Sequence, residues 1–392
     1  MSNNIICVAD DVGVRVWLER VLESEWNLEM VSSSDLSRVS RLVQATGAAV
    51  VVVAVDEHDS NRALKVFSAI QKACPEVHLI GVSQRVSQDL LLSIMRAGAR
   101  DCLITGIDSD SARERVRKIA DAAMPVHAGG HRASKGNITL LTSASPIVDT
   151  RFFAQNFVCE MSRSDTEKSI LALDTNSETN KTFYYDNLNR LTLNDLVSRG
   201  DSVDRSFIET ALEEFSSGLR LLSGQISSES LEGDFGADIY ITMSQLAGLF
   251  DHLVIRVEPA SVEGWLRAMG SDISNVILLT HPAVDQVQAS DAMLKLSKEW
   301  VGETCRFFVV VDGFEKKSNL SLADIEKTLG QACQLTLPLE WRCRLDAINA
   351  GIPMSLVPAK NRYERKLRNF VKDDFLAKRK GSARFLFKRA GS

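Results

Sequence analysis

Short runs of apolar residues alternate with amphipathic segments along this chain, and the alternation limits the fold more than any other feature of the sequence. The run Ala48–Val55 reads Ala-Ala-Val-Val-Val-Val-Ala-Val, so both faces of the strand that it predicts are apolar. Such a strand belongs in the middle of a parallel sheet with helices packed on each side. Strands that alternate with helices form parallel sheets through right-handed crossovers. The sequence therefore predicts an α/β fold.

The alternation predicts two domains. Residues 1–124 contain five strand-helix units, and the Gly-rich, aperiodic stretch 125–136 is interpreted as a linker. The alternation restarts over residues 137–376, and residues 377–392 form a basic tail. Both domains are expected to be three-layer, doubly wound parallel sheets. Strands are predicted at Ile5–Ala9, Ala48–Val55, His78–Val82, Asp101–Ile104, Asn137–Thr142, Ser169–Leu173, Leu219–Ser223, His252–Val257, Asn275–Thr280 and Cys305–Val311. One of the predicted helices spans Ser206–Glu214.

Composition agrees with a folded protein, but the charge is unevenly distributed. The 392 residues are 45% hydrophobic and carry a formal net charge of −5. From Lys360 to the end, twelve basic residues face three acidic ones, whereas the remainder holds 34 basic and 48 acidic residues. Seven scattered cysteines without a C-x-x-C pair fit a reducing compartment, and neither a signal peptide nor a membrane span is predicted. We expect a cytoplasmic protein with an attachment segment.

The C-terminal region divides into two parts. The apolar spacing over Asn361–Arg379 favours a helix docked on the second domain, with its cations solvated. Beyond it, cations flank a short apolar group, a composition that suits a peripheral membrane or an acidic partner. Nucleic acid is the weaker alternative, because the rest of the chain is acidic, and no nucleic-acid partner is expected. The residues of this tail contact are Lys378, Arg379, Lys380, Arg384, Phe385, Phe387, Lys388 and Arg389.

Nucleophilic and metal catalysis have no support in the sequence. His127 and His131 are four residues apart, but Gly129-Gly130 between them argues against the helix that such ligand spacing requires. The remaining histidines lack a carboxylate or cysteine at motif spacing, and no G-x-S-x-G occurs. No catalytic residue and no metal ligand is predicted from these patterns.

The first domain resembles a response-regulator receiver domain. The features that carry the resemblance are Asp10-Asp11 after the first strand, Ser83 after the fourth, and Gly98-Ala99 before the fifth. The resemblance implies that the acidic pair holds Mg²⁺, that an Asp ending the third strand accepts phosphate, and that a Lys after the fifth strand binds the phosphoryl group. An alternative for the acidic pair is an ordinary pair of carboxylates, one of which caps the following helix.

Two of the implied receiver positions are altered. Ala54 stands at the acceptor position, Asp56 follows two residues later, and Thr105 replaces the Lys. A phosphorylated carboxylate needs both a metal and a cation to neutralise it, so these changes weigh against phosphorylation. Phosphorylation would require Asp56 to enter the pocket.

The second domain resembles the ParA/MinD superfamily of deviant Walker ATPases, and within it the TadZ/CpaE branch of pilus-assembly proteins, which carries a receiver-like domain in front. Ser169–Asn176 resembles the strand that ends in D-x-D, and Phe250–Arg256 resembles the Walker B strand. Leu337–Glu340 and Asp346–Pro353 resemble the P-x-D and A-I-N-x-G-x-P signatures. The resemblance spans nearly the whole chain.

The phosphate-binding loop that the resemblance implies is degenerate. Alignment of its positions falls on Ser145-Pro146-Ile147-Val148-Asp149-Thr150-Arg151, which contains no glycine and no lysine. Pro146 has no N–H to offer a phosphate, and Asp149 would repel one. Arg256 replaces an acidic Walker B residue, whereas Asp174 is retained. Arg151 or Arg256 could supply replacement charge for a weakly bound nucleotide.

These losses predict a pseudo-ATPase without a bound cofactor. The resemblance implies a non-catalytic scaffold for assembly of a Tad-type (Flp) pilus secretion machine at the inner membrane or cell pole. Its implied partners are the secretion ATPase and inner-membrane Tad components. A homodimer would form without nucleotide or through the receiver-like domain. Two alternatives remain open: an active ParA/MinD-type ATPase with an unconventional loop, and a phosphorylation-dependent regulator.

Overall fold

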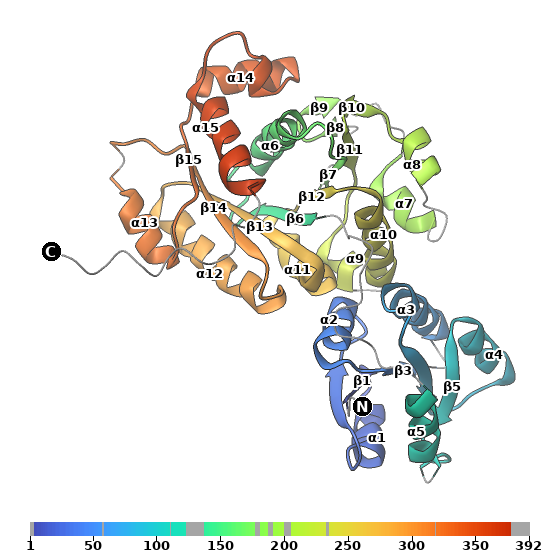
Figure 1. The fold of residues 1–392 in the computed structure, drawn as a ribbon. Coiled ribbons are helices and arrows are strands. Elements are labelled where there is room, and N and C mark those ends of the chain that lie inside the picture. Colours follow the sequence, from blue (N-terminus) through green and yellow to red (C-terminus); the bar gives the residue numbers. More distant parts are fainter. Residues whose placement is uncertain are drawn as a thin grey trace.

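Two parallel sheets organise the chain, each in a domain of its own (Figure 1). The structure is a computed structural model that describes residues 4–56, 59–109, 111–122, 137–176, 181–186, 191–199, 205–232, 235–317 and 319–377. The predicted linker at 125–136 and the tail contact from Lys378 onward lie outside the described residues.

The first sheet has five strands in the order β2-β1-β3-β4-β5, and every pairing in it is parallel. This order is one of the two common doubly wound arrangements of α/β proteins. Its strands are β1 (Asn4–Val8), β2 (Asn27–Val31), β3 (Val50–Val55), β4 (His78–Ser83) and β5 (Ala99–Ile104). Its helices are α1 (Val12–Leu22), α2 (Leu36–Thr46), α3 (Ser60–Ala73), α4 (Gln88–Arg96) and α5 (Ala112–Ala122).

The central strand β3 confirms the prediction drawn from its two apolar faces. Val50 and Val52 pack in the core beneath α1 and α5. Val51 and Val53 point the other way, into the core beneath α2, α3 and α4. Because successive side chains of a strand alternate between faces, an all-apolar run is buried on both.

The second sheet has eight strands in the order β10-β11-β7-β12-β6-β13-β14-β15. All pairings are parallel except β10 with β11, so the fold is the predicted doubly wound sheet with one antiparallel edge. Its strands are β6 (Asn137–Ser143), β7 (Ile170–Asp174), β10 (Glu214–Ser216), β11 (Leu219–Ser223), β12 (His252–Arg256), β13 (Ile273–Thr280), β14 (Arg306–Asp312) and β15 (Leu335–Leu337). A separate hairpin joins β8 (Lys181–Thr182) to β9 (Tyr185–Asp186).

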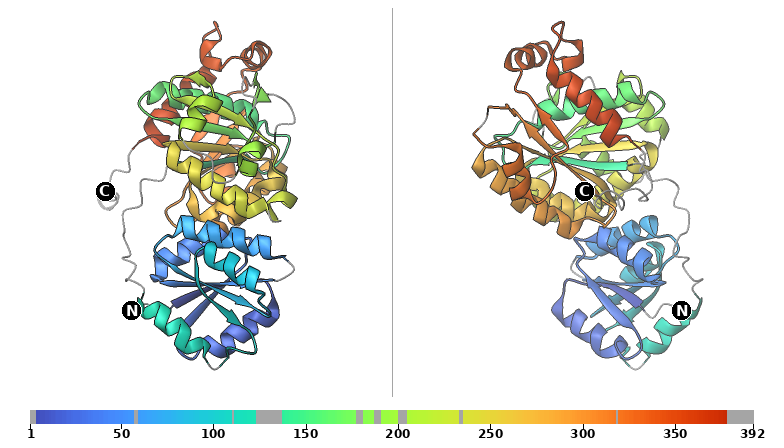
Figure 2. Two further views of the ribbon diagram at one scale, coloured as in Figure 1. Left: turned by 90° about the vertical axis from the view of Figure 1, so that its right-hand side faces the viewer. Right: turned by 60° about the vertical axis from the view of Figure 1, so that its left-hand side comes forward.

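Helices cover both faces of this second sheet (Figure 2). The α-helices are α6 (Thr150–Ser164), α7 (Leu193–Arg199), α8 (Arg205–Ala211), α9 (Ser228–Glu232), α10 (Phe235–Leu249), α11 (Val262–Met269), α12 (Val284–Trp300), α13 (Leu322–Leu329), α14 (Trp341–Ala350) and α15 (Arg362–Phe370). Short 3₁₀ segments occur at Pro259–Ser261, Gly270–Asp272 and Met354–Leu356, and a π-helical turn at Val371–Phe375.

The predicted helix Ser206–Glu214 is too long. The helix α8 ends at Ala211, and Glu214 begins the edge strand β10. Gly218 adopts a φ of 72° in the turn that leads from β10 into β11. Glycine reaches this left-handed conformation without a steric penalty, so the chain turns back into an antiparallel strand pair instead of extending the helix.

The predicted C-terminal helix docks on the second domain as the apolar spacing indicated, but it is shorter than the predicted range Asn361–Arg379, since α15 ends at Phe370 and a π-helical turn ends at Phe375. Tyr363, Leu367, Phe370 and Phe375 are buried. The rings of Phe157 and Phe375 are 4.9 Å apart in an edge-to-face arrangement, a favourable geometry for aromatic pairs. The segment therefore covers α6, the helix that follows the degenerate loop.

The two domains share an apolar contact. Helices α2 and α3 of the first domain lie against α10 and α11 of the second, and one cluster of buried side chains runs across the boundary (Figures 1 and 2). Polar bonds frame it: the Ser40 and Tyr240 hydroxyls are 3.0 Å apart, and Lys65 Nζ lies 2.7 Å from Asp238 Oδ2. The first domain is thus held by a buried surface, and the carboxyl edge of its sheet is left outside this contact.

Candidate functional site

The carboxyl ends of β6, β7 and β12 meet at the N-terminus of α6, which is where ligands bind in open α/β sheets. Asp149 caps α6, and its side chain accepts a hydrogen bond from the Phe152 N–H at 3.2 Å. Thr150 is the first residue of the helix and is buried. The sequence-predicted positions Thr150, Asp174 and Arg256 are therefore brought together at one edge.

The loop between β6 and α6 bonds largely to itself. The Val148 N–H donates to the Ser145 carbonyl at 3.2 Å, and the Thr150 N–H donates to the Val148 carbonyl at 2.9 Å. The Ser143 hydroxyl donates to the same Ser145 carbonyl at 2.8 Å. Phosphate-binding loops instead leave several N–H groups pointing into a common hollow. In this loop three of those donors, the N–H groups of Ile147, Val148 and Thr150, are already used, and Pro146 has none.

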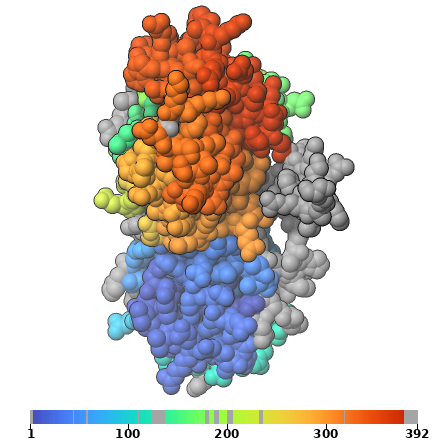
Figure 3. Space-filling model, turned by 90° about the vertical axis from the view of Figure 1, so that its left-hand side faces the viewer, coloured from blue at the N-terminus to red at the C-terminus, as the bar shows by residue number. Residues whose placement is uncertain are grey.

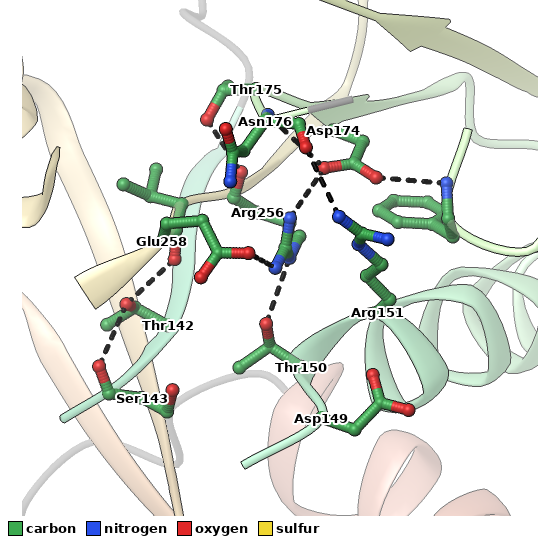
Figure 4. Close-up of polar contacts among 12 residues, drawn as sticks. Thr142, Ser143, Asp149, Thr150, Arg151, Asp174, Thr175, Asn176, Arg256 and Glu258 are labelled. Atoms are coloured by element: carbon green, nitrogen blue, oxygen red, sulfur yellow. Dashed lines mark hydrogen bonds and ion pairs between the residues drawn. The ribbon is translucent and has the colours of Figure 1, made fainter. Parts of the chain in front are cut away.

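Arg256 fills the space between the strand ends and the helix (Figure 4). Its Nε donates to the Thr150 hydroxyl at 2.9 Å, and its Nη1 lies 2.8 Å from Asp174 Oδ1. Its Nη2 pairs with the carboxylate of Glu258, two residues further along the chain. The guanidinium thus bridges the first residue of α6 to carboxylates at the ends of β7 and β12.

This arginine is a buried, fully charged group. Its side chain is 4% exposed, and its partner Asp174 is 1% exposed. Burial acts to lower the pKa of Arg256, but the charges of Asp174 and Glu258 outweigh burial and raise that pKa above its ordinary value. Both charged groups are buried, so each needs the charge of the other to offset its lost hydration.

Asp174 has further partners that close the site from the other side. Its Oδ2 accepts a hydrogen bond from the Phe183 N–H at 3.1 Å, and Phe183 adopts a φ of 57°, a strained value for a residue with a side chain. The next residue, Tyr184, donates its hydroxyl to Asp149 Oδ2 at 2.7 Å. Burial, and then the Asp149 charge, raise the pKa of Tyr184. The β8–β9 hairpin is therefore pinned to Asp174 and to the degenerate loop.

Arg151 does not contribute to the central network. It is half-buried, and its Nη2 donates to the Asn176 carbonyl at 3.3 Å (Figure 4). The predicted position Arg151 therefore lies beside the site and binds the segment that follows β7.

A second buried arginine pairs with a strand end on the same sheet. Arg344 of α14 donates to both oxygens of Asp312, the last residue of β14, with Nη1 to Oδ2 at 2.8 Å. Its guanidinium stacks between two rings, 5.1 Å from the centre of Phe152 and 4.8 Å from that of Tyr363. Cation–π contacts of this kind strengthen when water is excluded. Two arginines thus neutralise carboxylates at this edge.

Sequence reasoning missed Glu258, Tyr184 and the pair of Asp312 with Arg344. Glu258 had a signal, since it follows Arg256 by two residues and side chains two apart along an extended segment share a face. Tyr184 and Arg344 had none, because their contacts depend on how distant segments pack.

The predicted receiver positions surround a separate cavity of about 610 Å³ at the carboxyl edge of the first sheet. Asp10, Asp11, Ala54, Asp56 and Ser83 all line it. Ala54 lies near the carboxyl end of β3 and Asp56 directly follows its last residue, Val55, so the end of this strand brings both to the cavity. Asp59 and two arginines, Arg62 and Arg85, complete the charged lining.

Local hydrogen bonds engage the acidic pair of this cavity. Asp11 caps α1 by accepting the Val14 N–H at 2.8 Å, as the capping interpretation expected. Asp10 accepts from Ser32 and Ser33; burial opposes ionisation, but these bonds and the Arg62 charge together lower its pKa.

Thr105 stands apart from the cavity lining. Its N–H donates to the Ser83 carbonyl at 2.9 Å. In the described part of the chain, no group of three or more His, Cys, Asp and Glu side chains is placed to hold a metal ion.

No protein-family model and no curated protein matches the sequence. Solved structures do match in fold. A ParA family ATPase from Chlorobium tepidum TLS is 17% identical over 60% of this chain and 98% of its own, with a TM-score of 0.53. The MinC:MinD cell division protein complex of Aquifex aeolicus is 17% identical over 60% and 93%, with a TM-score of 0.48. A CheY-like protein (tadZ) from Pseudomonas aeruginosa PAO1 is 22% identical over 30% and 98%, with a TM-score of 0.28.

The fold therefore defines the class of this protein: an α/β receiver-like domain joined to a domain with the fold of the ParA ATPases. At these identities the likeness concerns the fold alone. No described helix is both long and apolar enough to cross a bilayer.

Proposed function

We propose that this protein is a non-catalytic scaffold whose ATPase-like domain binds no nucleotide. The observation that supports the proposal is the position of Arg256, whose guanidinium lies between Thr150 at the N-terminus of α6 and Asp174 at the end of β7. A triphosphate and its metal would need that volume, and Arg256 has committed its charge to Asp174 and Glu258.

Energetic reasoning supports the same proposal. A nucleotide would have to displace Arg256 and leave the buried carboxylate of Asp174 without its cation, which costs about 3–5 kcal/mol for a buried pair. The loop offers little in return, because it has no lysine and Pro146 lacks an N–H. Phosphoryl transfer depends on positioned cations around the phosphates, and this site supplies none that is uncommitted to a carboxylate or carbonyl in the described residues.

A domain without nucleotide binding could still position the components of a larger assembly. The sequence resemblance to TadZ/CpaE-type proteins points to assembly of a Tad-type (Flp) pilus secretion machine at the inner membrane or cell pole. In this proposal the partners are the pilus secretion ATPase and inner-membrane components, and the protein is peripheral to the membrane. The apolar contact of α2 and α3 with α10 would hold the receiver-like domain in a fixed orientation for them.

Titration of the whole chain with a fluorescent ATP analogue and Mg²⁺ tests the proposal. We expect no saturable binding up to about 1 mM, a dissociation constant that corresponds to only about 4 kcal/mol. The proposal would be overturned if the protein bound the ATP analogue with micromolar affinity and this binding were lost in Asp174→Asn but retained in the surface control Asp291→Asn. Capture of the protein from cells without any pilus-secretion component would count against the pilus assignment.

A phosphorylation-dependent regulator is the second candidate, because Asp56 lines the cavity of the receiver-like domain. Incubation with acetyl phosphate followed by intact-mass measurement decides between them. An adduct that disappears in Asp56→Ala would favour regulation, and an unmodified mass supports the scaffold.

A further inference from the structure

Four large apolar side chains are exposed on α14 and on the segments directly before and after it, at the end of the molecule opposite the receiver-like domain. They are Leu339, Trp341, Leu345 and Leu356, and we call them the tip patch. Trp341 is 62% exposed and Leu356 is 64% exposed. Figures 1 and 3 show that α14 and its neighbours form a protruding cap at this end. Single exposed apolar residues are ordinary, but a group on one surface marks an interaction site.

The backbone holds this patch in place from both ends of α14. Glu340 precedes the helix with a φ of 45°, which costs a residue with a side chain about 1–3 kcal/mol. Its carboxylate accepts the Arg362 N–H at 3.2 Å, so the start of α14 is tied to the start of α15. Gly351 ends the helix at a φ of 62°. Strain of this kind persists only where the surrounding contacts impose it.

One side of the helix α14 is buried against the domain, and another side carries exposed apolar residues. Arg344 and Ala347 are buried against the domain, where Arg344 pairs with Asp312. Trp341 and Leu345 lie four residues apart and share an exposed side of the helix, next to the buried side. Since the inner face already anchors α14, the exposed face is not needed to hold the helix in place.

Cations crowd the same end of the molecule. Arg342 follows Trp341 directly, and Arg362 and Arg365 are exposed on α15. Burial first, and then the charges of Arg362, Lys316 and Arg365, lower the pKa of Lys366. This effect shows that these positive groups lie near one another. Residues 339–370 hold seven Lys and Arg against three Asp and Glu, so positive charge is in excess around the apolar side chains, which favours a partner with negative charge.

We propose that the tip patch docks on an anionic phospholipid surface. Exposed tryptophan and leucine side chains enter the headgroup boundary, while lysine and arginine pair with acidic lipids. A second copy fits poorly, because a two-fold contact would bring the cations of both copies face to face. The inference deepens the proposed function, on which it rests for its membrane setting. It adds a contact surface within the folded domain, separate from the tail.

Sedimentation of the full-length protein with lipid vesicles tests the inference. Vesicles of phosphatidylcholine with about one third phosphatidylglycerol should bind the protein in about 0.1 M salt, and pure phosphatidylcholine should not. Trp341→Ser and Leu356→Ser should each weaken binding about tenfold. The matched control is Leu92→Ser, which replaces a leucine 46% exposed on α4 and should leave binding unchanged. Because every variant keeps residues 378–392, any binding by the tail is common to all of them.

Tryptophan fluorescence supplies a second readout that does not depend on affinity. Brominated lipids should quench the wild-type emission, and the conservative variant Trp341→Phe should keep vesicle binding but lose most of that quenching. Equal quenching in wild type and Trp341→Phe would overturn the inference. So would equal vesicle binding by wild type, Trp341→Ser and Leu356→Ser, or no binding by wild type, which would leave an acidic protein as the partner.

Failure here and failure of the scaffold proposal are distinguishable. Loss of the lipid contact leaves the ATP-analogue result untouched, since the tip patch and Arg256 share no residue. Nucleotide binding, in turn, would overturn the scaffold without affecting the vesicle measurements.

Discussion

Replacement of Arg256 by methionine should strongly destabilise the second domain. The substitution keeps much of the side-chain volume but removes the charge that neutralises Asp174 across 2.8 Å. Removal of one partner of a buried ion pair costs about 3–5 kcal/mol. Asp174 keeps the Phe183 N–H as a donor, and Glu258 is 21% exposed and can turn toward water. Because of these compensations, we expect the free energy of unfolding to fall by about 3 kcal/mol, the lower end of that range.

The assay is thermal and denaturant unfolding of Arg256→Met followed by circular dichroism. For a domain of this size each kcal/mol shifts Tm by roughly 2–4 °C, so the expected decrease is roughly 6–12 °C. The matched control is Lys295→Met, which breaks an exposed ion pair with Asp291 and should cost less than about 0.5 kcal/mol.

The effect of Asp174→Asn on the free energy of unfolding should have opposite signs in the wild type and in the Arg256→Met variant. Asp174→Asn should destabilise the wild type, because it breaks the pair with Arg256. In the Arg256→Met background the same change should stabilise the protein, because it removes a buried charge that has lost its cation. The reasoning is wrong if Asp174→Asn lowers the free energy of unfolding equally in both backgrounds, or if Arg256→Met changes it by less than about 1 kcal/mol.

Two further predictions concern the domain contact and an acid-sensitive ion pair. Tyr240→Ala removes a buried ring at the boundary between the domains and should lower the free energy of unfolding by about 3–5 kcal/mol. Calorimetry of this variant should then show two unfolding transitions, whereas the wild type should show one. A single transition, unchanged from that of the wild type, would contradict this prediction. Burial opposes ionisation of Asp251, but Lys168 and Ser169 donate to it and lower its pKa to about 2. Because the pKa in the folded state lies below the ordinary value of about 3.9, the stabilisation is present above about pH 4 and is lost toward about pH 2. The Tm of Asp251→Asn should therefore fall less over that range, and parallel curves for both proteins would refute the assignment.

The fold followed from sequence where burial dictates the pattern. The strand β3 is apolar on both faces because helices cover both, and the C-terminal helix shows its docked face at spacings of three and four. The edge strand β2, which reads Asn-Leu-Glu-Met-Val, gave a weak pattern because only Val31 is fully buried. The helix α14 was not predicted, because Trp341 and Leu345 are exposed and obscure the periodicity of its buried face.

The site was predicted as a set of positions and not as a set of contacts. The resemblance to the ParA/MinD superfamily pointed to Thr150, Asp174 and Arg256, yet it could not show that Arg256 reaches both of the others. The sequence also allowed Arg256 to serve as replacement charge for a nucleotide, whereas in the structure that charge is paired with Asp174 and Glu258. Pairing of this kind depends on strand order, which brings β7 beside β12.

The Arg256 network also bears on which changes could restore an ATPase to this fold. Arg256→Asp would restore an acidic residue at the Walker B position, but it would place three carboxylates together without a cation. Glycines and lysines added to the loop first would face a site whose space Arg256 still occupies. The first change is therefore destabilising by itself, and the second gives no nucleotide site while Arg256 remains. Because Arg256 is buried and paired with carboxylates, no single substitution in this network is expected to restore nucleotide binding to the domain.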